Sequence, residues 1–112
     1  MNTEEILEKY KRISAKQAKD VFEHPGDYVI LDVRRQDEYD AGHIKDSVLL
    51  PIEIVNEQTL AQTLPDKEQP VYVYCRAGHR SADVAFYMIS LGYTNVYDFG
   101  GLETDWTYEL EK

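Results

Sequence analysis

Two short segments of the chain are apolar at every position instead of at alternate positions. They are Tyr28–Leu31 and Val71–Tyr74. A run without alternation is typical of a strand that is covered on both faces. Segments with helical spacing separate the expected strands, and no hairpin signal joins any two of them, which favours right-handed crossovers. The sequence therefore predicts an α/β fold in which helices cover both faces of a parallel sheet.

The remaining elements are expected from capping and turn residues. Thr3 is expected to cap a short acidic N-terminal helix, and Ser14 and Gln17 stand at capping-box spacing at the start of a second helix. We expect further helices at residues 35–41, 52–64 and 80–91, and further strands at 48–50 and 96–98. Pro65 is expected to end the helix at 52–64, and Gly92 the helix at 80–91.

The length and charge of the chain narrow the class of protein. A chain of 112 residues with 43% hydrophobic residues has room for one core of normal size. Its formal net charge of −9 disfavours binding to nucleic acid or to an anionic membrane surface. No stretch approaches the roughly 18 consecutive apolar residues of a membrane span, and no secretory signal opens the sequence. We expect a cytoplasmic protein, although a removed signal peptide would leave the same sequence.

The chain has one cysteine, Cys75, which therefore cannot form an internal disulfide. Cys75 directly follows an expected buried strand, and the next residues form the turn into a helix. Ligands bind at this edge of an open parallel sheet. A helix N-terminus also favours a thiolate over a thiol, and Gly78 allows the backbone to curl so that successive N–H groups face inward.

Most free cysteines are buried small hydrophobic residues, and that is the alternative interpretation of Cys75. The residues that follow argue against it, because Arg76, His79 and Arg80 would repel one another without an anionic partner. The sequence thus predicts a cationic pocket around the only thiol. His79 alone is as consistent with a solvated loop residue as with stabilisation of a thiolate.

Several segments of the chain resemble the rhodanese sulfurtransferases, over about residues 13–106. The active-site loop of that family resembles Cys75-Arg76-Ala77-Gly78-His79-Arg80-Ser81. The other matching segments, in order, are Leu31-Asp32-Val33-Arg34, Glu38-Tyr39, Gly42-His43-Ile44, Leu50-Pro51, Leu91-Gly92-Tyr93 and Gly100-Gly101 with Trp106. The ordered set is far more specific than any one of its members.

The resemblance implies a three-layer fold with a mainly parallel five-stranded sheet and one domain over residues 1–112, of which residues 1–12 form a short helical extension. It implies that Cys75 takes a sulfane sulfur from a donor such as thiosulfate and passes it, as a persulfide, to cyanide or a thiol. The implied partners are a small anionic donor and a small-molecule or protein thiol. The implied binding residues are Arg76, Ala77, Gly78, His79, Arg80 and Ser81.

Residues outside the loop have supporting roles in this interpretation. Asp32 is expected to hydrogen-bond loop residues or Arg34, and Glu38 to pair with Arg34 or Arg35. His43 is expected to fix a turn. Tyr39 and Trp106 are candidates for the pocket mouth, which the sequence does not decide. The histidines and the cysteine show no metal-ligand spacing, so we expect neither a metal nor a cofactor.

Three other functions remain as alternatives. A cysteine phosphatase or arsenate reductase would share a cysteine loop that ends in arginine, but the phosphatase signature resembles Cys-x5-Arg, whereas only four residues separate Cys75 from Arg80. A regulatory module with this fold commonly lacks the cysteine. A persulfide carrier for a dedicated partner would keep it and cannot be told from an enzyme by sequence.

Overall fold

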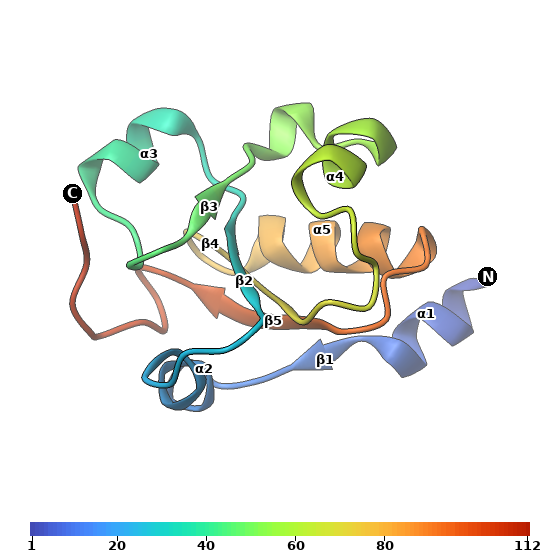
Figure 1. The fold of residues 1–112 in the computed structure, drawn as a ribbon, viewed down its shortest axis with the longest axis horizontal. Helices are drawn as coiled ribbons and strands as arrows, with labels where there is room; N and C mark the ends of the chain where they lie inside the picture. Colours follow the sequence, from blue (N-terminus) through green and yellow to red (C-terminus); the bar gives the residue numbers. More distant parts are fainter.

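The computed structural model describes residues 1–112 and contains one five-stranded parallel sheet (Figure 1). The strands are β1 (Lys11–Arg12), β2 (Val29–Asp32), β3 (Val48–Leu49), β4 (Val71–Cys75) and β5 (Val96–Gly101), in the spatial order β1-β5-β4-β2-β3. The helices are α1 (Thr3–Lys9), α2 (Ala15–Phe22), α3 (Gln36–Ala41), α4 (Glu57–Thr63) and α5 (His79–Ser90), with a 3-10 turn η1 at Ile52–Ile54. The predicted α/β class and parallel sheet are confirmed.

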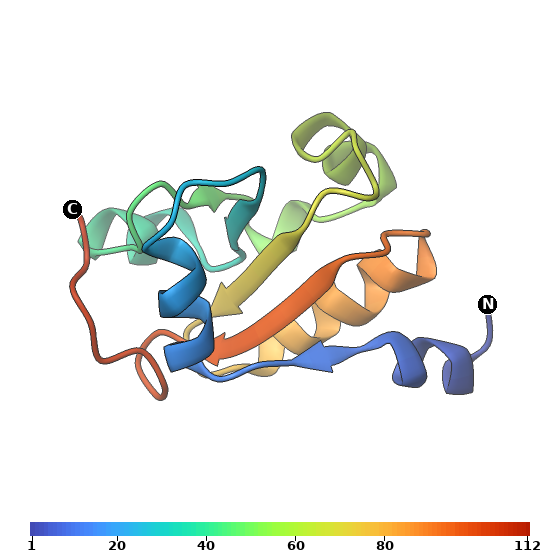
Figure 2. The ribbon, with the colours of Figure 1, turned by 60° about the horizontal axis from the view of Figure 1, so that its bottom comes forward.

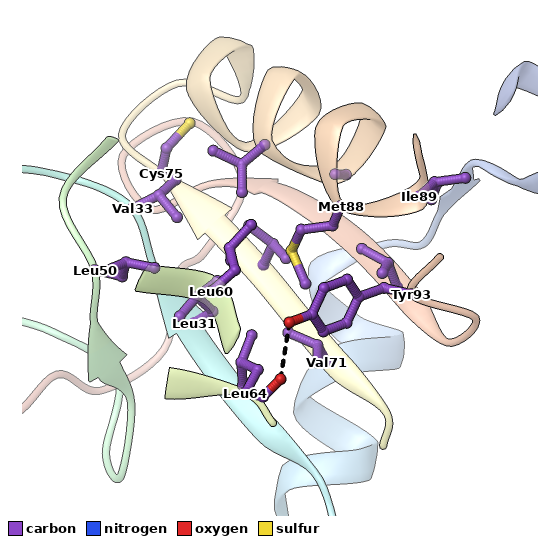
Figure 3. Close-up of a cluster of buried hydrophobic side chains, with 14 residues drawn as sticks. Leu31, Val33, Leu50, Leu60, Leu64, Val71, Cys75, Met88, Ile89 and Tyr93 are labelled. Atoms are coloured by element: carbon purple, nitrogen blue, oxygen red, sulfur yellow. Dashed lines mark hydrogen bonds between the residues drawn. The ribbon is translucent and has the colours of Figure 1, made fainter. Parts of the chain in front are cut away.

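Successive residues of the central strands contribute to two different cores, one on each face of the sheet. On one face, Val71, Val73 and Cys75 belong to a cluster that α4 and α5 cover (Figure 3). On the other face, Tyr72 and Tyr74 belong to a second cluster beneath α2. This burial on both faces explains why β2 and β4 carry apolar runs without alternation.

The helix starts are only partly as expected. The capping box of α2 is present, with Ser14 accepting from the N–H of Gln17 at 3.0 Å. The cap of α1 is Asn2 and not Thr3, because the Asn2 side chain accepts from the N–H of Glu5 while Thr3 already lies inside the helix.

The single helix expected at residues 52–64 is wrong. The chain forms the short turn η1, leaves helical geometry at Val55 and begins again at α4, because Asn56 caps α4 through the N–H of Thr59. Asn in a cap position competes with an uninterrupted helix through such side-chain bonds.

Two features of the sheet escaped the sequence analysis. Strand β1 has only two residues, both exposed, so it carries no apolar pattern. Strand β5 extends three residues beyond the expected end at Asp98, through Gly100 and Gly101, and Figure 2 shows it lying between β4 and β1. A side chain at Gly101 would place Cβ 2.5 Å from the carbonyl oxygen of Arg76, so this glycine permits close packing of β5 against the cysteine loop.

None of the helices is both long and apolar enough to span a bilayer.

Candidate active site

Cys75 is the last residue of β4 and is almost completely buried. Its sulfur lies at one end of the core cluster and points away from the other labelled side chains (Figure 3). The N–H of Gly78 donates to the Cys75 Sγ at 3.0 Å. Gly78 has a φ of 94° and precedes the first turn of α5, so a residue with a side chain would be strained there. The loop thus directs the positive end of a helix at the sulfur.

A cavity of about 330 Å³ lies over this loop. Its lining consists of Cys75, Arg76, Ala77, His79, Arg80, Glu103 and Thr104. Five of the seven predicted loop residues therefore meet at one hollow. The other two, Gly78 and Ser81, contact the Cys75 sulfur instead, Ser81 through its Oγ at 3.5 Å. A buried thiol, the N–H of Gly78 that faces it and a small hollow are features that a covalent intermediate on sulfur would require.

Each arginine of the loop pairs with a carboxylate, which the sequence analysis did not anticipate. Arg80 donates from both terminal nitrogens to Glu38 at 2.9 and 3.1 Å. Arg76 donates to Glu103 at 2.8 Å. The loop is consequently closer to neutral than its sequence alone indicates, and attraction of an anion depends more on the backbone N–H groups and the helix end.

The expected pairing of Glu38 with Arg35 is present, but Glu38 has a closer partner in Arg80 that the sequence did not predict. The Arg35 Nε lies 4.0 Å from Glu38, whereas Arg80 binds it in bidentate fashion. The hydrogen bonds from Arg80 lower the pKa of Glu38 to about 2, against the smaller opposing effect of burial. Glu38 and Arg80 are 42 positions apart, and only the packing of α3 near the start of α5 brings them together.

Asp32 and Arg34 form a buried salt bridge beside the site. Arg34 donates to Asp32 from Nε at 3.0 Å and from Nη2 at 2.8 Å, and Nη2 also donates to the carbonyl of Gly42 at 2.7 Å. Both side chains are buried. Their contacts support the turn after β2 and do not reach Cys75.

The two aromatic candidates for the pocket mouth lie elsewhere. Tyr39 donates to the carbonyl of Ser47 and stacks on His43, whose Nδ1 is 2.9 Å from the carbonyl of Tyr39. Trp106 lines a larger hollow of about 840 Å³, together with Phe22 and Tyr28. That hollow contains no cysteine, so the smaller one is the candidate active site.

A buried carboxylate behind the cysteine was missed by the sequence analysis. Asp98, on β5, accepts from the Ser81 Oγ at 2.8 Å and from the N–H of Gly100 at 2.9 Å. Its second oxygen accepts from the hydroxyl of Tyr10. A buried aspartate inside an otherwise apolar strand was the signal that could have revealed it, because a buried charge requires partners.

The fold and the site together define a class of α/β proteins that hold a thiol at the amino end of a helix. Within that class, residues 14–107 match the family described as Rhodanese-like domain. This match covers most of the chain, and the chain belongs to the rhodanese-like family.

Curated relatives and solved structures agree with this assignment. Thiosulfate sulfurtransferase GlpE of Coxiella burnetii is 38% identical over 96 residues, which cover 85% of this chain and 86% of that protein. Thiosulfate sulfurtransferase PspE of Escherichia coli is 36% identical over 73 residues, 65% of this chain and 69% of that protein. The crystal structure of a rhodanese-related protein from Thermoplasma volcanium is 28% identical, with a TM-score of 0.76, over 91% of this chain and 98% of that one.

Proposed function

We propose that the protein is a sulfurtransferase that carries a sulfane sulfur on Cys75. The observation that carries the proposal is the contact of the Cys75 sulfur with the N–H of Gly78 at the start of α5. Such a contact stabilises a negative sulfur, which is the reactive form of a thiol. The relatives named thiosulfate sulfurtransferase supply the class of reaction.

In the first half-reaction, the Cys75 thiolate attacks the outer sulfur of thiosulfate. A new S–S bond forms on Cys75, the S–S bond of thiosulfate breaks, and sulfite leaves with the electron pair. The product is a persulfide anion whose charge lies on the outer sulfur. The N–H groups of the loop and the end of α5 stabilise that charge within the cavity.

In the second half-reaction, an acceptor attacks the outer sulfur and Cys75 leaves as the thiolate. Cyanide gives thiocyanate by this route, and a thiol gives a new persulfide. Cys75 is the only cysteine, so no internal thiol competes by forming a disulfide. The sulfur therefore passes to an external acceptor, either a small molecule or a protein thiol.

The other loop residues act in binding and support. Arg76 and Arg80 remain at the cavity despite their carboxylate partners, and their guanidinium groups can orient the sulfonate of the donor. His79 and Ala77 line the same hollow, and the Asp32–Arg34 pair supports the turn after the neighbouring strand.

The test is a steady-state assay of thiocyanate formation from thiosulfate and cyanide. The wild type should form thiocyanate and the Cys75→Ser variant should not. An assay with an aryl phosphate, run in parallel, tests the phosphatase alternative. Absence of thiocyanate above the Cys75→Ser level would overturn the proposal, and phosphate release that depends on Cys75 would replace it.

A further inference from the structure

Asp98 is a fully buried carboxylate that the proposed reaction does not use. It lies on β5, beside the strand that carries Cys75. Its first oxygen accepts from the Ser81 Oγ and from the N–H of Gly100. Its second oxygen accepts from the Tyr10 hydroxyl at 2.5 Å and lies 3.8 Å from the Arg12 Nη1. Three hydrogen bonds and one cation compensate the burial of this charge.

The hydroxyl of Ser81 has only one proton to donate. Three acceptor oxygens surround the Ser81 Oγ: Asp98 Oδ1 at 2.8 Å, the carbonyl of Gly78 at 3.3 Å and the carbonyl of Gly100 at 3.5 Å. The carboxylate is the closest of the three and the only charged one, so it takes the proton. The Ser81 Oγ therefore presents a lone pair to the Cys75 sulfur at 3.5 Å and accepts from its S–H.

Two of the groups that hold Asp98 come from the N-terminal segment, outside the family match at residues 14–107. The pairing of β1 with β5 places Arg12 opposite Asp98, and the ring of Tyr10 stacks on Phe86 of α5 at 4.5 Å. Burial, and after it the hydrogen bond to Asp98, together raise the pKa of Tyr10 to about 12. Tyr10 consequently keeps its proton and remains a donor to Asp98.

We propose that Asp98 is a positioning residue that fixes Ser81 as an acceptor for the Cys75 S–H, and that Tyr10 and Arg12 moderate the charge of Asp98. The inference concerns the thiol of the proposed sulfurtransferase and rests on that function only for its biological meaning. A lone pair and a carboxylate behind the sulfur favour the thiol, in opposition to the N–H of Gly78 and the helix end. The Cys75 sulfur thus faces an acceptor, the Ser81 Oγ, and a donor, the N–H of Gly78.

The other carboxylates and arginines near the sulfur pair with one another. Arg80 pairs with Glu38 from α3, and Arg76 pairs with Glu103, which follows β5. His79 lines the cavity at the first turn of α5. On β2, Asp32 forms a salt bridge with Arg34. Asp98 is therefore the one buried carboxylate that a chain of hydrogen bonds connects to Cys75.

This arrangement has a consequence for each half-reaction. A thiolate of higher proton affinity is a stronger nucleophile towards sulfur once it has formed. In the persulfide, the charge moves one bond outward, away from Asp98 and towards the cavity. Asp98 therefore disfavours the charged resting thiolate more than it disfavours the charged persulfide.

The test is the rate of Cys75 alkylation by iodoacetamide as a function of pH, followed by intact mass. With a single cysteine, every adduct reports on this thiol. Asp98→Asn should move the midpoint of the profile to lower pH and reduce the limiting rate at high pH, by about threefold for each pH unit of movement. Tyr10→Phe, which leaves Asp98 with less compensation, should move the midpoint to higher pH.

Asp105→Asn is the matched control, because Asp105 also lies near Arg12, at 3.6 Å, and accepts from the N–H of Gly101 but does not contact Ser81. Its midpoint should move less than that of Asp98→Asn. Equal movement, an unmoved Asp98→Asn midpoint, or movement of Asp98→Asn and Tyr10→Phe in the same direction would each overturn the inference.

Two further measurements keep the test decisive. The ultraviolet absorbance of the thiolate, taken as the difference from Cys75→Ser, gives the same midpoint without requiring reagent access. If Asp98→Asn does not fold, the direction of the Tyr10→Phe movement decides. Alkylation requires no sulfur transfer, so failure here and failure of the proposed function are separate results.

Discussion

Two aspartates flank β4 near its carboxyl end, and their surroundings differ. Asp32 on β2 is paired in register with Tyr74, and Asp98 on β5 with Val73. Both are completely buried. Asp32 faces the side of the sheet where Arg34 lies over the ring of Tyr74, whereas Asp98 faces α5 and Ser81.

The two aspartates differ in the partners that compensate their charge. Asp32 is neutralised by the buried guanidinium of Arg34, which donates hydrogen bonds to both of its oxygens. Asp98 is held mainly by hydroxyl and backbone donors. Its one cation, Arg12, lies 3.8 Å away and is itself about half exposed. The charge of Asp98 is therefore compensated less completely than that of Asp32, and Ser81 connects Asp98 to the sulfur by hydrogen bonds.

The largest expected effect comes from removing the cation of the buried Asp32–Arg34 salt bridge. Arg34→Met leaves Asp32 buried without its cation and should lower the free energy of unfolding by about 3 to 5 kcal/mol. Urea denaturation measures this loss. The alkylation midpoint of Cys75 in the folded variant should stay near the wild-type value.

Arg35→Met is the control, because Arg35 is exposed and touches neighbouring carboxylates only at 3.5 and 4.0 Å. Its unfolding free energy should stay within about 0.5 kcal/mol of the wild type. Equal losses in the two variants, or a large movement of the alkylation midpoint in Arg34→Met, would break the distinction between the two aspartates.

A smaller effect is expected at the pair of Glu38 and Arg80, which is more exposed than either aspartate. Glu38→Gln should lower the free energy of unfolding at neutral pH by about 1 to 2 kcal/mol, between the values for exposed and buried pairs. The pKa of Glu38 lies at about 2 in the folded protein, below its ordinary value of 4.5. The ionised form therefore stabilises the fold above about pH 4.5, and this contribution is lost as the pH falls towards 2.

Urea denaturation between neutral pH and pH 3 checks this sign. The difference between wild type and Glu38→Gln should shrink as the solution becomes more acidic. Glu103→Gln is the matched control, since Glu103 and Arg76 are both exposed by more than half, and its effect should be small at every pH. A Glu38→Gln difference that grows on acidification would contradict the assigned ion pair.

The sequence predicts features that depend on neighbouring residues. The capping box at Ser14, the apolar runs of β2 and β4, and the position of Cys75 before a helix all follow from local spacing. The Asp32–Arg34 pair spans two positions and was among the expected contacts. In each case the partners are close along the chain, so the fold adds little to what the sequence contains.

The contacts that tune the site are long-range, and this is why they escaped prediction. Arg80 reaches Glu38 across 42 positions, and Tyr10 reaches Asp98 across 88. The second contact also requires β1, a strand too short and too exposed to carry a pattern. The sequence indicated two unpaired arginines at the loop, and only the folded structure shows that each of them pairs with a carboxylate.

The central claim is that Cys75 holds the transferred sulfur, and intact mass spectrometry tests it most directly. After incubation with thiosulfate and removal of the excess, the wild type should gain the mass of one sulfur atom on the peptide that contains Cys75. Addition of cyanide should remove that mass and release thiocyanate. Wild-type protein that gains no sulfur under conditions in which Cys75 is alkylated readily, or a sulfur adduct that persists in Cys75→Ser, would contradict the claim.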